Sequence, residues 1–298
     1  MTPPVPSRDS ASGRAYNDVR NLARRHDRDP AEYFTLYALE GVLGRLALSA
    51  SASDFVLKGG VLMAAFAARR PTRDIDMAAR GFANDIAEVE RRIRTILAVK
   101  RDDGLSFDPA SVRGEEIRDE ADYTGVRVGA VAQLATAHVA LHIDVNFGDP
   151  IWPAPTEAVL PLLLGGSLRL LGYPDHMVLA EKIVTAIERG EQNTRWRDFT
   201  DISAIASTRM VEGALLQEAI AVVARFRQIA LEPLGPMVSQ MPGLAQRKWT
   251  VWRRRQRLEA RTPESFADVL GECVAFAEPA IAGRVGQLTW SPTARSWE

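Results

Sequence analysis

The sequence predicts an α+β fold, in which a mixed sheet with helices is followed by an α-helical C-terminal domain. Over residues 54–77, a short apolar strand, a glycine turn, an apolar helix and a second strand follow one another. Over residues 124–146, apolar residues recur with a period of two, which is typical of two further strands. After Pro174 the periodicity is that of helices.

This pattern divides the chain into three parts. Residues 1–14 are rich in Pro, Ser and Gly, so we expect a mobile tail there. We expect a sheet-containing domain over 15–173 and a helical domain over 174–298. Other expected elements are helices near 31–50, 61–69 and 84–100, a short strand near 167–171, and helices near 175–190, 195–208, 211–231, 243–259 and 263–277.

The composition is that of an ordinary globular protein, with 46% hydrophobic and 25% charged residues. The single cysteine, Cys273, cannot form an internal disulfide, and the N-terminal residues lack the pattern of a signal peptide. The longest stretch without Asp, Glu, Lys or Arg, residues 128–143, is too short and too polar to cross a membrane. We therefore expect a cytoplasmic protein without a membrane partner. With a net charge of −1, it would need local basic patches to bind nucleic acid.

The most informative motif combines a glycine turn with two carboxylates. Lys58 follows the first strand, expected over residues 54–57, and Gly59 and Gly60 form the turn, whose backbone amides can face a phosphate. Asp74 and Asp76 share one face of the next strand, because residues i and i+2 of a strand point the same way. Two adjacent carboxylates suit a magnesium ion carried by a nucleotide. The alternative for an Asp-x-Asp motif is an exposed loop or edge strand with solvated acids.

A third carboxylate, Asp144, lies on the polar face of the later strand that ends near Asn146. If this strand neighbours the one that carries Asp74 and Asp76, the three acids could bind two divalent ions. Such ions orient a triphosphate and activate an acceptor hydroxyl, which is the chemistry of nucleotidyl transfer. A carboxylate near the end of a strand is equally typical of a turn, so both interpretations of Asp144 stay open.

The first two helices of the helical domain carry further charged residues. Lys182 and Arg189 share a face of one helix. This face is either a solvated polar stripe or the site from which Lys182 reaches the nucleotide phosphates. Asp198 and Asp201 lie one turn apart near the start of the next helix, where acids interact favourably with the helix dipole.

A basic segment over residues 248–257 interleaves two tryptophans with five basic residues. It could hold a phosphate backbone and stack a base. A helix with a buried tryptophan face explains the pattern equally well. On the first interpretation, the RNA-binding residues are Trp252, Arg253, Arg254 and Arg255.

Taken in order, four of these motifs resemble the AbiEii/AbiGii-type nucleotidyltransferase toxins, including their MenT-type tRNA-modifying branch. They are Lys58-Gly59-Gly60 and the segments 72–76, 181–189 and 195–202. The resemblance implies a DNA polymerase β-like nucleotidyltransferase domain with a helical C-terminal domain, magnesium dependence, an NTP substrate and a cognate antitoxin. In MenT-type members, the acceptor is the 3′ end of tRNA, whose modification blocks aminoacylation.

Position by position, the resemblance makes Asp74 and Asp76 metal ligands, places Lys182 on the nucleotide phosphates, and makes Asp198 the acidic residue of the last motif. Many members have Ser after the first glycine, but this chain has Gly60, so only the backbone can donate there. The expected catalytic set is therefore Asp74, Asp76, Lys182 and Asp198, with Asp144 as a further metal ligand. The expected nucleotide-binding set is Lys58, Gly59, Gly60, Arg189 and Asp201.

The expected function is that of a toxin enzyme that transfers a nucleoside monophosphate from an NTP to RNA, at the 3′ end of tRNA, and so blocks translation. One alternative keeps the same metal site but modifies a small molecule, as antibiotic-modifying nucleotidyltransferases do. The other is a non-catalytic module that binds RNA or protein. The sequence does not select an NTP, and it leaves a protein hydroxyl open as the acceptor.

Overall fold

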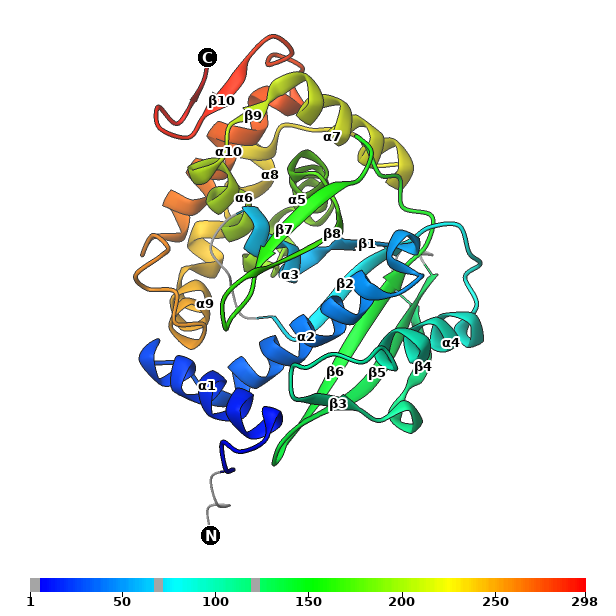
Figure 1. Cartoon of the computed structure of the whole chain (residues 1–298). Helices are drawn as coiled ribbons and strands as arrows, with labels where there is room; N and C mark the ends of the chain where they lie inside the picture. The colour runs from blue at the N-terminus through cyan, green and yellow to red at the C-terminus, as the bar shows by residue number, and fades with distance from the viewer. Residues whose placement is uncertain (1–5, 67–71, 119–123) are drawn as a thin grey trace. The chain divides into compact units, whose positions relative to one another are not determined.

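The computed structural model describes residues 6–66, 72–118 and 124–298 (Figure 1). The chain divides into two compact units, and the main boundary falls between Gly172 and Tyr173. The first unit contains a mixed sheet with helices, and the second is mainly helical. The predicted α+β class with a helical C-terminal region is therefore confirmed.

The sheet of the first unit has eight strands within the described residues, in the order β3-β5-β6-β2-β1-β8-β7, with β4 paired to β5. Its parallel pairs are β2 with β6 and β1 with β8, and the other pairs are antiparallel. The strands are β1 (Phe55–Lys58), β2 (Asp74–Ala79), β3 (Leu105–Phe107), β4 (Arg113–Arg118), β5 (Thr124–Leu134), β6 (Ala137–Asn146), β7 (Thr156–Pro161) and β8 (Ser167–Gly172).

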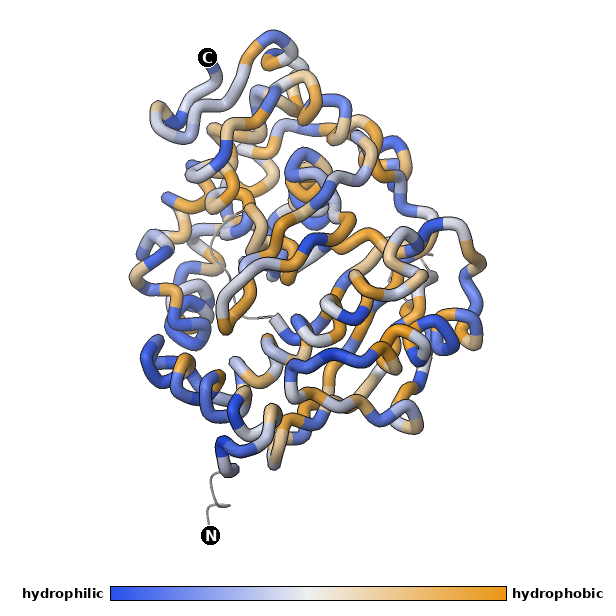
Figure 2. Tube along the Cα trace, in the orientation of Figure 1, coloured by the Kyte–Doolittle hydropathy of each residue, from blue (hydrophilic) through white to orange (hydrophobic). Residues whose placement is uncertain are grey.

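The predicted alternation along β5 and β6 is confirmed. On β6, the inward positions Val139, Leu141, Ile143 and Val145 are buried. The structure also places β6 directly beside β2, which meets the condition under which Asp144 neighbours the aspartate pair. Hydrophobic stretches run along the central strands in Figure 2, whereas α1 (Ala11–Arg25) is largely hydrophilic.

Four helices lie in the part of the chain before β5 that the structure describes: α1, α2 (Pro30–Leu48), α3 (Gly59–Phe66) and α4 (Ile86–Leu97). The expectation of a tail over residues 1–14 needs correction at residues 11–14, because α1 begins at Ala11, whereas residues 1–5 lie outside the described part of the chain. The Ser10 side chain accepts a hydrogen bond from the Gly13 N–H and so caps this helix. The helix predicted over 61–69 corresponds to α3, and its last residues lie outside the described part of the chain.

Helices α2 and α4 differ in how they meet the sheet. Most positions of α2 are buried on every side, as expected for an apolar helix that packs against β6, β8, α1 and α4. Helix α4 buries one stripe, at Val89, Ile93, Ile96 and Leu97, and exposes charged residues on its other face. Its N-cap is Asp85, whose side chain accepts from the Glu88 N–H.

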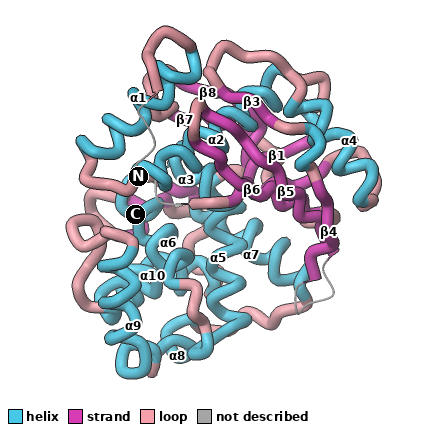
Figure 3. The backbone as a smooth tube through the Cα atoms, turned by 90° about the horizontal axis from the view of Figure 1, so that it is seen from below, coloured by secondary structure: helices cyan, strands magenta, loops and turns pink. Residues whose placement is uncertain are grey.

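The second unit confirms the five helices predicted after Pro174 and adds a shorter one, α8. They appear in cyan in Figure 3. Helix α5 packs against α7, and α10 against α6 and α9. None of the helices in the described residues is long and apolar enough to cross a lipid bilayer. They are α5 (Asp175–Arg189), α6 (Trp196–Thr208), α7 (Gly213–Arg227), α8 (Leu234–Val238), α9 (Met241–Arg255) and α10 (Phe266–Ile281).

A small sheet made of β9 (Val211–Glu212), β10 (Thr289–Ser291) and β11 (Ser296–Trp297) accounts for the C-terminal tryptophans. The Trp290 Nε1–H donates to the Ala206 carbonyl at 2.7 Å, and the Trp297 ring stacks on Phe276. Both indoles therefore anchor the C-terminal strands to the helices of this unit.

Candidate functional site

A row of four charged side chains crosses one face of the large sheet. The strand register sets Lys58 opposite Asp76, Asp76 opposite Asp144, and Asp144 opposite Arg127. Register partners on neighbouring strands point to the same face, so the four side chains lie in line. Two carboxylates thus occupy the middle of the row, and a cation stands at each end.

The glycine turn wraps closely around the carboxylate of Asp76. Gly59 has φ +67°, in the left-handed region that favours glycine, and an added Cβ would lie 2.0 Å from Asp76 Oδ2. The backbone N–H of Gly60 donates a hydrogen bond to Asp76. The turn that was expected to face a phosphate is therefore built around an acid, and phosphate binding by Gly59 and Gly60 stays a prediction.

The environment of Asp76 disfavours its negative charge. Burial raises the pKa of Asp76 above its ordinary value, and the nearby charges of Asp144 and Asp74 raise it further. Lys58 and the Gly60 N–H oppose this shift but do not cancel it. A divalent cation beside Asp76 would supply the missing positive charge, so the residues present fit a magnesium ion at this position.

Asp74 stands at the more exposed end of the same strand face. Its side chain is 39% exposed, and Oδ1 lies 3.3 Å from Nδ1 of His142, its register partner on β6. Asp74 and Asp76 alternate with the buried residues Ile75 and Met77, as the strand periodicity predicts. The interpretation as a loop is therefore wrong, and one acid of the pair is open to solvent.

Asp144 is already held by a basic partner. Arg127 donates from Nε to Oδ1 at 2.8 Å and from Nη2 to Oδ2 at 2.7 Å. This fork occupies both carboxylate oxygens and raises the pKa of Arg127 above its ordinary value. Across residues 6–66, 72–118 and 124–298, no group of three or more His, Cys, Asp or Glu side chains is placed to hold a metal ion. Asp74 and Asp76 therefore form the better-placed pair, and a role for Asp144 as third ligand stays a prediction that requires Arg127 to move.

Lys58, at the other end of the row, is paired as well. Its Nζ lies 2.6 Å from Oδ2 of Asp149, and both side chains are largely buried. This ion pair ties the end of β1 to the loop that follows β6. Sequence reasoning missed Asp149, because its position in a loop carries no periodic signal.

A second charged cluster lies within the helical unit. Lys182 Nζ on α5 is 2.8 Å from Asp198 Oδ1 and 2.9 Å from Asp201 Oδ2, both on α6. All three side chains are largely buried, and Asp201 is only 3% exposed. The structure thus brings together three of the residues singled out in the sequence and excludes a solvated stripe for Lys182. Arg189 lies half-buried at the C-terminal end of α5.

The basic segment forms the second half of α9 and divides into buried and exposed parts. Trp249 is fully buried, and its Nε1–H donates to the Glu264 carbonyl at 3.1 Å, so the buried-tryptophan interpretation holds at this position. Arg253 donates to the carbonyls of Glu259 and Thr262, at 2.6 and 2.9 Å. This guanidinium therefore holds the loop after α9 in place, and its assignment to RNA binding stays a prediction.

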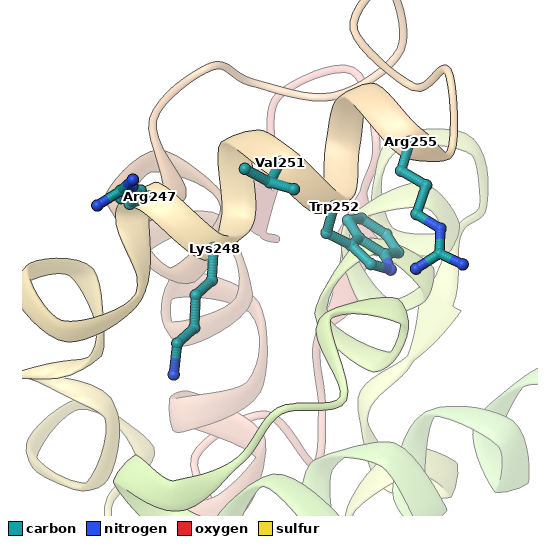
Figure 4. Close-up of a pocket in the computed structure, with 5 residues that line it drawn as sticks. All are labelled: Arg247, Lys248, Val251, Trp252 and Arg255. Atoms are coloured by element: carbon teal, nitrogen blue, oxygen red, sulfur yellow. The ribbon is translucent and has the colours of Figure 1, made fainter.

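A surface pocket of about 460 Å³ lies along the exposed side of α9 (Figure 4). Two of the proposed RNA-binding residues, Trp252 and Arg255, line it. Arg254 is exposed but does not line the pocket. Arg247 and Lys248 also line it, although they stand outside the set named from the sequence.

Comparison with known proteins gives one family. The family described as "Nucleotidyl transferase AbiEii toxin, Type IV TA system" matches residues 41–279, a range that includes both charged clusters and α9. No curated protein matches the chain. Two crystal structures from Helicobacter pylori are similar in fold at low sequence identity. JHP933 has 11% identity and a TM-score of 0.46 over 83% of this chain and 90% of that one. A "putative nucleotidyltransferase" has 12% identity and a TM-score of 0.47 over 85% and 96%.

Proposed function

Because this chain belongs to the nucleotidyltransferase AbiEii toxins of type IV toxin–antitoxin systems, we propose that it transfers a nucleoside monophosphate from an NTP to the 3′ end of tRNA. The acceptor hydroxyl oxygen bonds to the α-phosphorus, the bond between the α-phosphorus and its bridging oxygen breaks, and pyrophosphate leaves. The hydroxyl proton passes to solvent. The modified tRNA end can no longer be aminoacylated, so translation stops.

One observation carries the proposal, namely the pairing of Asp74 and Asp76 on one strand face beside the glycine turn. In this proposal the two carboxylates hold Mg²⁺, which suits oxygen ligands of this kind. Bound Mg²⁺ would neutralise triphosphate charge and polarise the reacting oxygens. The chain itself contributes the rigid β2 strand and the close fit of Gly59 around Asp76, which keep one acid in a single orientation.

The flanking cations of the row position the acids. Lys58, paired with Asp149, stands beside Asp76 and limits repulsion among the carboxylates. Arg127 holds Asp144 in a fixed orientation on the neighbouring strand. We assign Arg127 to positioning. Lys58 also has a positioning role, and together with Gly59 and Gly60 it belongs to the nucleotide side of the site.

In the helical unit, we propose that Lys182 acts on the nucleotide phosphates, with Asp198, Asp201 and Arg189 supporting nucleotide binding. The support is the order of the family motifs together with the observed cluster of Lys182, Asp198 and Asp201. Two carboxylates around one ammonium group hold it in a defined place. The membership of the family in toxin–antitoxin systems further implies a cognate antitoxin protein as partner.

Purified full-length protein, incubated with each labelled NTP, Mg²⁺ and total RNA, tests the reaction directly. We expect label in tRNA-sized RNA with at least one NTP. Asp76→Asn should abolish this label, whereas Asp102→Asn, which changes an exposed acid outside the site, should retain it. Absence of label in RNA with every NTP, from folded protein, would contradict the proposal.

The labelling reaction and a growth assay in cells together separate the two alternatives. Label in a low-mass product with unlabelled RNA would identify a small-molecule nucleotidyltransferase. Growth inhibition that persists undiminished in cells producing Asp76→Asn would identify a non-catalytic binding module, because such a module does not need the carboxylate pair.

A further inference from the structure

Trp252 is the outermost ring of an aromatic stack that runs from the interior of the helical unit to the surface of α9. The rings of Phe266 and Trp249 are fully buried, with centroids 5.2 Å apart. Trp252 stacks on Trp249 with centroids 5.3 Å apart and an interplanar angle of 26°. Since Trp249 is anchored by its hydrogen bond to Glu264, the Trp252 indole is held in place and loses little freedom when a further ring stacks on it.

The pocket beside this indole is basic. Arg247, Lys248, Val251, Trp252 and Arg255 line it, and their spacing places them along one side of α9. Figure 4 shows Arg247, Lys248 and Arg255 around the pocket, with the indole of Trp252 between Val251 and Arg255. Helix α9 contains no Asp or Glu. Within the described part of the chain, no salt bridge involves Arg247, Lys248 or Arg255, so their charges are available to an anion.

We propose that this pocket binds an unpaired stretch of RNA, with one base stacked on Trp252 and adjacent phosphates on Arg247, Lys248 and Arg255. The inference rests on the proposed RNA acceptor and names the surface that holds it. A fixed indole beside three cations matches a chain in which planar bases alternate with phosphates. A base-paired duplex hides its ring faces, and an acidic peptide would use the cations without needing the indole.

The test measures binding of a fluorescein-labelled unpaired RNA oligonucleotide to the full chain by fluorescence anisotropy, at several salt concentrations. Trp252→Ala should weaken binding on the order of tenfold or more, and Trp252→Phe, which keeps an aromatic ring, should restore most of it. Replacing Arg247, Lys248 or Arg255 by Gln should reduce the salt dependence of binding. Arg284→Gln, an exposed arginine of the same unit outside the pocket, is the matched control and should bind like the wild type.

The outcomes for the pocket and for the reaction can be told apart. If the protein labels RNA but Trp252→Ala binds the oligonucleotide as tightly as the wild type does, the pocket inference is overturned while the proposed function stands. If RNA is never labelled but binding depends on Trp252, the pocket inference stands and the proposed reaction fails. Binding of polyglutamate or of duplex RNA with equal affinity and equal dependence on Trp252 would also overturn the inference. Asp76→Asn should bind the oligonucleotide as tightly as the wild type does. This result would show that the measured binding depends on the α9 pocket and not on the catalytic carboxylates.

Discussion

Asp76 and Asp144 lie opposite each other on the parallel strands β2 and β6, yet only Asp144 is held by a guanidinium. Asp76 instead faces a glycine turn and the ammonium group of Lys58, and burial raises its pKa. The two neighbouring acids are therefore not equivalent. The negative charge of Asp76 is only partly compensated by its neighbours, whereas that of Asp144 is already neutralised by the ion pair with Arg127.

Magnesium should stabilise the wild-type protein and not the Asp76→Asn variant. A ligand that binds only the folded state raises the free energy of unfolding by about 2.7 kcal/mol when its concentration is 100 times its Kd. We expect Tm, followed by circular dichroism, to rise with Mg²⁺ and to fall back with a chelator. An equal rise in Asp76→Asn and the wild type would show that the ion binds elsewhere. Without magnesium, the substitution should leave Tm unchanged or raise it, because it removes charge repulsion within the row.

Gly59→Ala should lower both activity and stability. The new methyl group would meet the Asp76 carboxylate at 2.0 Å, and the backbone at φ +67° disfavours a side chain, so we expect a loss of about 1–3 kcal/mol. Gly271→Ala is the matched control, since this exposed position within α10 has open space around it. That variant should be more stable by up to about 1 kcal/mol, because alanine favours helix more than glycine does. Urea unfolding measures both changes, and equal effects at the two glycines would contradict the close fit around Asp76.

Arg127→Gln should destabilise the protein by about 1–2 kcal/mol, because it leaves Asp144 beside Asp76 without its basic partner. The arginine is 40% exposed, so solvent screening keeps this loss well below that of a buried pair. Arg127→Lys should recover only part of it, since an ammonium group cannot form the two-point fork. Arg169→Gln breaks the exposed pair with Glu157 and should change the free energy of unfolding by less than about 0.5 kcal/mol. Equal losses for the two glutamine variants would argue against a special role for Arg127.

Lys182→Ala should be among the most destabilising substitutions in the helical unit. It leaves Asp198 and Asp201 as neighbouring, largely buried acids without their shared cation, a change that typically costs about 3–5 kcal/mol. Its loss of activity must therefore be measured at a temperature where the variant is folded. Lys182→Arg keeps the positive charge and should lose less stability than Lys182→Ala does. If the arginine variant is folded but inactive, the ammonium group has a role in the reaction besides the ion pairs.

The stability of the helical unit should fall in acid partly through Asp175. Burial alone would raise its pKa, but the hydrogen bond and charge of His176 and the charge of Arg209 lower the pKa of Asp175 below its ordinary value. A carboxyl whose folded-state pKa is lowered stabilises the fold above its unfolded pKa, near 3.9, and loses that contribution as the pH falls further. Asp175→Asn should therefore be less stable than the wild type at pH 7, with the difference narrowing below about pH 4. Urea unfolding across this range measures it, and a difference independent of pH would exclude the carboxyl as its source.

Local periodicity predicted most of the regular structure. The helices after Pro174 and the strands β1, β2, β5 and β6 follow from apolar spacing, which depends on near neighbours along the chain. The short strands β3, β4 and β7 were not predicted. Each forms by pairing with another strand, and the sequence alone does not show which strand that is.

The pairing of Arg127 with Asp144 could have been derived from the sequence, given the position of one turn. The hairpin register sets Leu134 opposite Ala137, and counting outward from this tight turn brings Arg127 opposite Asp144. No Asn-Gly or Asp-Gly pair marks the turn. Its position could therefore not be predicted, and neither could the strand register that depends on it.

By itself, the sequence determined that Asp74 and Asp76 share a face, that Lys182 and the acids Asp198 and Asp201 occupy successive helices, and that a basic segment contains tryptophans. These are properties of one element at a time, set by the repeat of its backbone. Only the tertiary structure decided that Arg127 forms an ion pair with Asp144 and that Asp149 pairs with Lys58. It also decided that Arg253 hydrogen-bonds to a loop, whereas Trp252 lies at the surface. Such choices depend on strand register and on contacts between distant segments, which the packing of the folded chain selects.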